Sequence, residues 1–251
     1  MPNSLTKLLA SNKKRPERLP QSRIVAAADG RETEIYIYDA IVADEDTAYW
    51  WGGVAAETLV PEIRAIKGGT IHLRINSPGG DVFAAQTICQ AIRDTGAKVV
   101  AHIDGYAASA ATVIATAADE VEISDGGFFM IHNAWTWAMG NANDLTATAT
   151  LLSKIDGTLA AQYAKKSGMA VDDVRAAMDA ETWYTAEEAV SAGLVDRIAA
   201  GKKADAAWNM SAYAKAPKIE QEPEQVDPVA TEEHRVRQQQ RIRMLACQPI
   251  S

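Results

Sequence analysis

Hydrophobic and polar residues follow two different periods along the middle of the chain. Short runs in which apolar residues alternate with polar ones, or follow one another directly, predict strands. These runs lie at residues 34–38, 71–76, 99–103, 121–124 and 128–132. Apolar residues spaced three and four apart predict amphipathic helices over residues 81–95 and 144–166. Because strands and helices alternate, we expect an α/β fold.

One expected strand ends in a turn suited to binding an oxyanion. The run 71–76 leads into Pro78-Gly79-Gly80, and a helix is expected directly behind it. Glycine lets the main chain turn tightly and approach a substrate, so that a backbone N–H can face a developing negative charge. The N–H group of Gly80 is therefore a candidate oxyanion donor.

A second expected strand leads to a serine. After residues 99–103 the chain becomes rich in alanine, and residues 107–118 are expected to form an apolar helix that holds Ser109. The positive end of a helix dipole favours an anion near the helix N-terminus. We interpret Ser109 as a candidate nucleophile and the N–H group of Ala110 as a second oxyanion donor. The alternative is that Ser109 is a small residue at the start of a core helix.

A nucleophilic serine needs a base, and the chain has four histidines. His72 and His102 lie at alternating positions of expected strands, where they belong to the sheet, and His234 lies in a charged region near the C-terminus. His132 follows the apolar run 128–131, so a strand would carry it to the edge of a sheet. His132 is therefore the candidate general base.

The third member of a catalytic triad is a carboxylate that orients the imidazole and stabilises its cation. Asp179 and Glu181 precede the expected last core helix, and both are candidates. If both lie on one strand, they face the same side, so periodicity does not choose between them.

Four segments together resemble the ClpP family of serine peptidases, in the order of that family. They are INSPGG at 75–80, GYAASA at 105–110, MIHN at 130–133 and TAEEAVSAGLVD at 185–196. The resemblance covers about residues 30 to 200. It implies a ClpP/crotonase-like α/β fold of repeated strand-strand-helix units, with residues 144–166 as a long handle helix through which rings of subunits stack.

The resemblance also implies a role for each candidate residue. Ser109 would be the nucleophile, His132 the general base, and the N–H groups of Gly80 and Ala110 the oxyanion hole. The segment after His132 would run as a strand beside a bound peptide.

Three departures from the usual ClpP pattern indicate a more specific class. The position four residues before Thr185, usually an aspartate in the family, is Glu181, and Asp179 is kept as the alternative acid. Ala110 replaces the usual methionine after the serine, and residues 133–140 are aromatic instead of glycine-rich. These features resemble the ClpP-like head maturation proteases of tailed phages and prophages, which implies a scaffold or capsid protein as the polypeptide substrate.

Composition agrees with a peptidase and argues against other classes. The formal net charge of −8 disfavours nucleic acid as a partner, because phosphate binding needs a basic surface. The two cysteines imply no disulfide framework, and neither a secretory signal nor a membrane-spanning run is found. We therefore expect no membrane partner and a location in the bacterial host cytoplasm or the assembling prohead. No histidine or cysteine spacing offers a metal site, and the chemistry needs no cofactor.

The ends of the chain differ in composition from its middle. Residues 1–29 are basic and are expected to form a flexible arm, and residues 30–200 to form the peptidase domain. Residues 201–251 are charged and rich in proline and glutamine, which predicts a linker and tail. Tethering to a scaffold, self-cleavage and plain disorder are equally compatible with this composition.

Three other functions stay open. A housekeeping Clp-type peptidase would work with an unfoldase, and a crotonase-like acyl-CoA enzyme would use the oxyanion hole without a serine. A structural assembly protein would carry the triad incidentally. Only an activated Ser109 would react with a fluorophosphonate.

Overall fold

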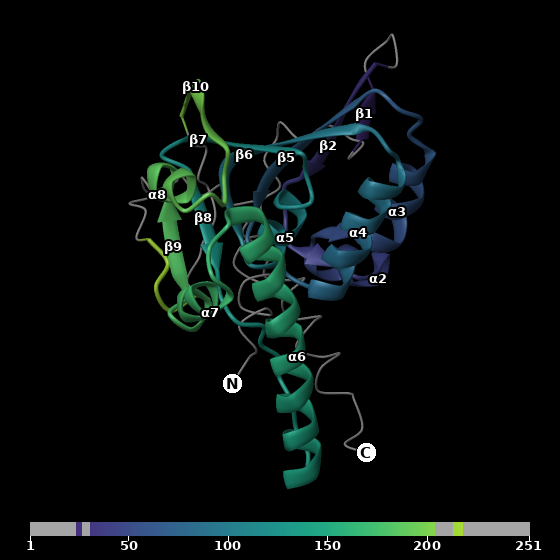
Figure 1. Ribbon diagram of the computed structural model, residues 1–251. Coiled ribbons are helices and arrows are strands. Elements are labelled where there is room, and N and C mark those ends of the chain that lie inside the picture. Colours follow the sequence, from purple (N-terminus) through teal and green to yellow (C-terminus); the bar gives the residue numbers. More distant parts are fainter. Residues whose placement is uncertain (1–23, 27–30, 204–212, 218–251) are drawn as a thin grey trace, which may run out of the picture. The chain divides into compact units, whose positions relative to one another are not determined.

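A mixed sheet of eight strands forms the centre of the computed structural model, which describes residues 24–26, 31–203 and 213–217 (Figure 1). In chain order the strands are β1 (Ile24–Ala26), β2 (Glu32–Ile37), β3 (Ile41–Val42), β4 (Val54–Ala55), β5 (Thr70–Ser77), β6 (Lys98–Ala108), β7 (Glu120–Asp125), β8 (Phe128–Ile131), β9 (Thr182–Thr185) and β10 (Arg197–Lys203). The helices are α2 (Glu45–Trp51), α3 (Ala56–Ala65), α4 (Val82–Asp94), α5 (Ala110–Ala115), α6 (Ala142–Ser167), α7 (Val171–Asp179) and α8 (Ala186–Ser191).

The strand order confirms the expected α/β fold. The sheet runs β1-β2-β5-β6-β7-β10, while β8 attaches to β6 and β9 attaches to β8. Neighbours from β2 to β10 on this path are parallel, and β1 and β9 are the antiparallel additions. Parallel neighbours need crossover connections, and α3 and α4 supply them on one side of β2 and β5 (Figure 1).

One face of the main sheet forms the hydrophobic core. Alternate residues of β2, β5 and β6, such as Ile35, Leu73 and Ile103, are fully buried. They belong to one cluster with Ile63 of α3 and Ile88 of α4. Burying a side chain of this size contributes roughly 2 kcal/mol, so the alternation along each strand fixes which face turns inward.

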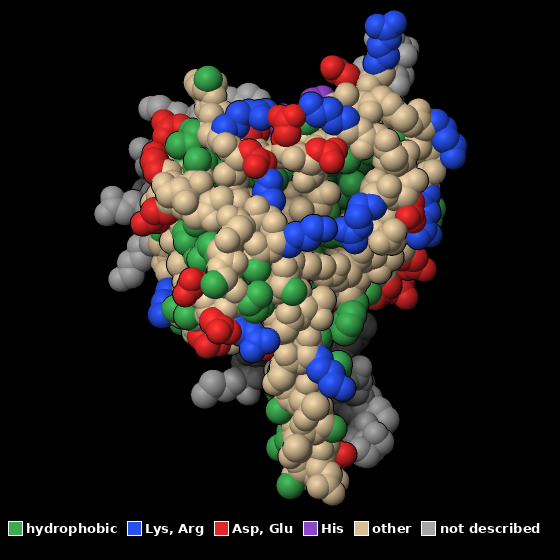
Figure 2. Space-filling view, viewed as in Figure 1, with side chains coloured by type: hydrophobic (Ala, Val, Ile, Leu, Met, Phe, Trp, Pro, Cys, Tyr) green, Lys and Arg blue, Asp and Glu red, His purple; other side chains and the backbone are tan. Residues whose placement is uncertain are grey.

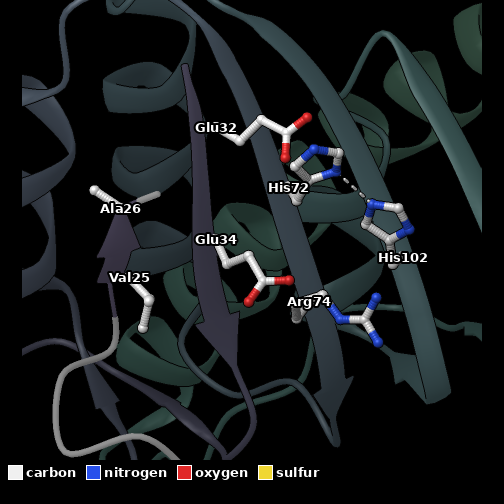
Figure 3. Close-up of a pocket in the computed structure, with 7 residues that line it drawn as sticks. All are labelled: Val25, Ala26, Glu32, Glu34, His72, Arg74 and His102. Atoms are coloured by element: carbon white, nitrogen blue, oxygen red, sulfur yellow. Dashed lines mark hydrogen bonds between the residues drawn. The ribbon is translucent and has the colours of Figure 1, made fainter. Parts of the chain in front are cut away.

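The opposite face of the same strands is polar. His72 Nδ1 lies 2.8 Å from His102 Nε2, and His102 Nδ1 lies 2.6 Å from a carboxylate oxygen of Glu122. Arg74 pairs with Asp104 beside them. Figure 3 shows His72, Arg74 and His102 around a hollow that side chains of β1 and β2 also line. Both histidines are therefore sheet residues, as their alternating positions predict.

The two halves of β6 pair with different strands. Its first half pairs with β7, whereas its second half pairs with β8 in the register from Tyr106↔Phe128 to Ala108↔Met130. The helix expected over residues 107–118 is therefore wrong at its start, since β6 continues to Ala108 and α5 spans only Ala110–Ala115. Backbone pairing with β8 overrides the helix propensity of the alanines.

Helix α6 is anchored at one end and projects at the other. Its buried side chains, Leu159, Ala160, Tyr163 and Ala164, all lie in its C-terminal half. Figure 1 shows the N-terminal half extending away from the sheet. The helix begins at a capping box formed by Asn141 and Asp144 and ends at Gly168 in the left-handed conformation.

Most other expected elements are confirmed with small shifts of their bounds. The strands expected at 34–38 and 121–124 correspond to β2 and β7, and the helix expected at 81–95 is α4. The expected arm, domain and tail boundaries stay predictions, because most residues of the arm and tail lie outside the described part of the chain. β1 and residues 213–217 are the described pieces within the arm and the tail beyond β10.

Candidate active site

The register of β6 and β8 brings the candidate serine and histidine together. Ala108 at the end of β6 pairs with Met130 of β8, and the Ser109 N–H group donates to the Met130 carbonyl at 3.0 Å. The two strands are parallel, so the residues that follow them emerge at the same sheet edge. Ser109 comes directly after β6, and His132 comes directly after β8.

The antiparallel strand β9 brings an acidic residue to the same place. Ile131, the last residue of β8, pairs with Thr182, the first residue of β9. Glu181, which precedes β9, therefore lies next to His132, which follows β8. The two candidate acids do not share a strand: Asp179 ends α7, and Glu181 lies in the turn before β9. The expectation that both might face the same side of a strand is therefore wrong.

The Ser109 hydroxyl is positioned to pass its proton to His132. The Ser109 Oγ atom lies 2.8 Å from His132 Nε2. Ser109 has a φ of 54°, and Glu181, with a φ of 48°, is the other non-glycine residue of positive φ among the described residues. Such conformations cost free energy and concentrate at functional sites.

Ala110 is the first residue of α5, so its N–H group has no acceptor within the helix and is available as an oxyanion donor.

Gly79 packs directly against the serine. A Cβ atom added to Gly79 would lie 2.4 Å from the carbonyl oxygen of Ala108 and 2.8 Å from the Cβ atom of Ser109. The φ of 86° also favours glycine. The Pro78-Gly79-Gly80 turn and the serine turn therefore touch through their backbones.

The N–H group of Gly80 points away from strand β3. The hydrogen bonds on either side of Gly80 run from the Ile41 N–H to the Gly79 carbonyl at 2.8 Å and from the Asp81 N–H to the Ile41 carbonyl at 2.9 Å. In this parallel pattern the amide of the residue between the two bonds faces the opposite side. A Cβ atom here would lie 2.1 Å from the Ile41 carbonyl oxygen, so only glycine fits.

His132 is held in its neutral form. Burial lowers the pKa of His132 to about 4, and the negative charge of Glu181 offsets part of this effect. Asp179 accepts a hydrogen bond of 2.7 Å from the Asn133 side chain instead. Glu181 is thus the candidate acid whose charge acts on His132, although within the described residues no hydrogen bond joins them.

The Ser109 turn is braced by a buried hydroxyl pair. The Thr112 hydroxyl donates to the Ser109 carbonyl at 2.5 Å, so it accepts from the Tyr163 hydroxyl at 2.6 Å. Both Thr112 and Tyr163 are fully buried. Tyr163 belongs to α6, so the anchored half of that helix supports the backbone of the candidate nucleophile. The helical period of residues 144–166 places Tyr163 on the apolar side of that helix, but the sequence pattern does not predict its contact with Thr112.

An aromatic residue from the expected tail lies over the site. The Tyr213 ring makes edge-on contacts with His132, at 5.4 Å between centroids, and with Trp183, at 5.7 Å. The Tyr213 hydroxyl donates to the Pro78 carbonyl at 2.5 Å. The only signal for this contact in the sequence is a tyrosine within a short alanine-rich stretch.

The backbone after Tyr213 engages the candidate acid. The N–H groups of Ala214 and Lys215 donate to the Glu181 carboxylate at 3.3 and 2.7 Å. The Lys215 ammonium donates to the Ala180 carbonyl at 2.5 Å. The Trp183 indole lies at 3.4 Å from the same carboxylate, so Glu181 is surrounded by donors other than His132.

The segment after His132 differs from the expectation. Residues 132–140 form no strand, and the Ala134 N–H group donates to Asp156 of α6 at 2.7 Å. Within the described residues no cluster of three or more His, Cys, Asp or Glu side chains is arranged to hold a metal ion. No helix in the described part is long and apolar enough to span a membrane.

The Ser109 hydroxyl is hydrogen-bonded to a neutral histidine, a carboxylate acts on that histidine, and Gly79 packs against the serine turn. This is the arrangement of a serine hydrolase. The sequence profile of the Clp protease family matches residues 54–202, which is more than half of the chain. The chain therefore belongs to the Clp protease family.

Individual relatives agree with this assignment. An ATP-dependent Clp protease proteolytic subunit of Bacteroides fragilis is 34% identical over 133 residues, which cover 52% of this chain and 64% of the relative. Proteolytic subunit 1 of Leifsonia xyli is 32% identical over 130 residues, which cover 51% of this chain and 66% of the relative. Proteolytic subunit 2 of Tropheryma whipplei is 27% identical over 177 residues, which cover 66% of this chain and 97% of the relative. The chain thus spans about three fifths of the first of these curated relatives.

Substituting Gly79 by alanine is expected to destabilise the fold more than the same change at Gly68. Both glycines have left-handed φ values, 86° and 70°, so each substitution carries a conformational cost of roughly 1–2 kcal/mol. A Cβ atom at Gly68 has nothing within 4 Å, whereas one at Gly79 overlaps the Ala108 carbonyl. Urea unfolding should show an additional loss of roughly 1–3 kcal/mol for Gly79→Ala. Equal losses would contradict the close packing of the two turns.

The His132 ring is expected to stay neutral until the pH falls to about 4. The ordinary pKa of 6.5 applies to the unfolded chain, which therefore binds the proton more readily between these values. This group consequently lowers stability as pH falls below about 6.5 and makes no pH-dependent contribution above it. NMR titration of the ring measures the midpoint, and a value near 6.5 would show that the ring is not desolvated.

Proposed function

We propose that this protein is a serine endopeptidase with Ser109, His132 and Glu181 as its triad. The observation that carries the proposal is the 2.8 Å contact between Ser109 Oγ and His132 Nε2. The strained serine turn, held against Gly79, supports it, because an incidental serine needs no such conformation. Membership of the Clp protease family and relatives named as proteolytic subunits point to the same activity.

The proposed mechanism assigns one task to each group. His132 accepts the Ser109 proton as the hydroxyl attacks the scissile carbonyl, and Glu181 stabilises the imidazolium that forms. The N–H groups of Gly80 and Ala110 donate to the oxyanion. His132 then protonates the leaving amine, and a water activated by the same base releases the acyl group. This sequence needs no metal ion and no cofactor.

We assign the protein further to the ClpP-like head maturation proteases of tailed phages and prophages, with scaffold or capsid segments as substrates. The support lies in three departures from the usual ClpP pattern: Glu181 as the acid, Ala110 after the serine and aromatic residues after His132. Trp135 and Trp137 are 40% and 62% exposed in that segment, where they can contact a peptide. Such an enzyme acts in the bacterial host cytoplasm or the prohead. Portal and capsid genes beside its gene would support this class, and an unfoldase gene would favour a housekeeping peptidase.

The projecting half of α6 suits assembly into an oligomer. Leu145 and Leu151 on this half are 45% and 51% exposed. Figure 2 shows apolar side chains along the part of the helix that extends from the domain. Exposed apolar side chains on one element favour contact with another subunit. We therefore include a homo-oligomer, with α6 as the handle between subunits, in the proposal.

Replacing Ser109 by alanine is expected to abolish peptide cleavage and fluorophosphonate labelling in a chain that still folds. Loss of a triad nucleophile lowers turnover by several orders of magnitude, on the order of 10³-fold or more. Circular dichroism and urea unfolding check the fold. Wild-type turnover by folded Ser109→Ala would overturn the proposal. A wild-type protein that neither cleaves peptides nor labels would favour a crotonase-like enzyme or a structural assembly protein.

Glu181→Gln is expected to lower kcat strongly with little change in KM, because the interaction with the imidazolium develops in the transition state. Asp179→Asn is the matched control, since Asp179 bonds to the Asn133 side chain and not to the imidazole. Steady-state kinetics at matched stability compares the two. If Asp179→Asn loses activity while Glu181→Gln does not, Asp179 is the acid of the triad.

A further inference from the structure

The short segment that lies over the triad comes from this chain itself. Residues 213–217, here called the strap, begin ten positions after Lys203, the end of β10. Ten extended residues reach at most about 35 Å, so the strap is tethered close to the site. A tether of this length produces an effective concentration on the order of millimolar, at which modest contacts keep a site occupied.

The strap occupies three parts of the site at once. Its tyrosine ring contacts the His132 ring, and the tyrosine hydroxyl bonds to the Pro78 carbonyl of the turn that carries Gly80. Burial raises the pKa of this hydroxyl, and the Ser109 side chain, which is hydrogen-bonded to His132, offsets part of that rise. Tyr213 also packs on an apolar cluster that includes Tyr106 and Met130. A peptide substrate approaching Ser109 would have to displace this ring.

The strap also binds Glu181, the proposed acid of the triad, through its backbone N–H groups. Glu181 accepts hydrogen bonds from two successive strap amides, at 2.7 and 3.3 Å, and none of its bonds goes to His132. Hydrogen bonds to a carboxylate are among the stronger ones in proteins. In this arrangement the imidazole makes no hydrogen bond to a carboxylate that would orient it.

The seating of the strap differs from that of a substrate. Cleavage needs a backbone carbonyl carbon next to the serine Oγ atom. The strap instead places the Tyr213 ring on His132 and its hydroxyl on the Pro78 carbonyl, while the backbone N–H groups of Ala214 and Lys215 face Glu181. The strap therefore lies in the site without presenting a scissile bond to the nucleophile.

We infer that residues 213–217 are an autoinhibitory strap, which closes the active site by placing Tyr213 over Ser109 and His132 and by binding Glu181 through the Ala214 and Lys215 amides. The inference rests on the proposed peptidase function, because inhibition is defined by that activity. The open state is reached when the strap leaves and a peptide takes its place. The strap thus sets how much of the enzyme is competent to react.

The test compares fluorophosphonate labelling rates of the full chain and three variants. Tyr213→Ala should label faster by about tenfold or more, the gain expected if the closed state holds at least nine-tenths of the molecules. Tyr213→Phe keeps the ring and loses the hydroxyl, so its rate should fall between the two. Tyr49→Ala is the matched control, because Tyr49 is an 80% exposed tyrosine on α2, and it should label at the wild-type rate.

Two further measurements follow the strap itself. In the wild-type chain the Ala214 and Lys215 amides should exchange hydrogen slowly by NMR, and Tyr213→Ala should remove this protection. A synthetic peptide of residues 211–218, Ser-Ala-Tyr-Ala-Lys-Ala-Pro-Lys, should slow the labelling of Tyr213→Ala when added in trans.

Several outcomes would overturn the inference, and they differ from failure of the proposed function. Wild-type chain that labels as fast as folded Tyr213→Ala, or rapid exchange of the Ala214 and Lys215 amides in wild type, would show that the strap does not close the site. Cleavage within the strap, seen as a shorter chain by mass spectrometry, would make it a substrate. If no variant labels at all, the peptidase proposal fails, and autoinhibition fails with it.

Discussion

Pairing between the second half of β6 and strand β8 is the constraint on which the candidate site depends. It ends β6 at Ala108, forces the chain into the turn at Ser109 and aligns the serine with the histidine that follows β8. β9 then adds to β8 in the opposite direction and delivers Glu181 to the same edge. Three residues from distant parts of the chain therefore meet because one short strand has a neighbour on each side. A shift of this register by one residue would turn alternate side chains to the wrong face.

Two residues of the site have strained backbone conformations, and hydrogen bonds from the surrounding structure offset the cost of the serine turn. Positive φ angles at Ser109 and Glu181 cost about 1–3 kcal/mol each. The serine turn is held by hydrogen bonds from its own N–H group and to its carbonyl, each contributing roughly 0.5–1.5 kcal/mol. The Thr112 hydroxyl links that carbonyl to Tyr163 of α6. The helix proposed to join subunits is thus also the one that braces the nucleophile, so a change in α6 at an interface can reach the serine turn through a single buried hydroxyl pair.

Local patterns predicted the elements whose side chains alternate between core and solvent, and they located the serine and histidine by the strands before them. They failed at the start of α5, because Ala107 and Ala108 have high helix propensity but pair with β8. Spacing also could not place Glu181, whose neighbourhood depends on a turn that ends α7 and opens β9. Contacts between residues far apart, such as Thr112 with Tyr163, leave no periodic signal in a single sequence. The short elements between residues 41 and 65 are too brief to establish a period.

A site that is proposed to bind extended peptides can also bind a segment of its own chain, which is held near it at high local concentration. The Tyr213 ring packs against Trp183 and against the apolar cluster that includes Met130, so this surface favours a segment that offers an aromatic ring. The Glu181 carboxylate, which carries a negative charge in a partly desolvated place, attracts backbone N–H groups when it has no imidazolium to bind. His132 is neutral in this state, so the carboxylate gains more from two amides than from an uncharged ring. In the proposed mechanism a proton moves onto His132 during acyl transfer, and the carboxylate would then gain more from the imidazolium, which offers both a charge and a hydrogen bond. Under both proposals the Glu181 carboxylate would favour the closed state when His132 is neutral and the transition state when His132 is protonated.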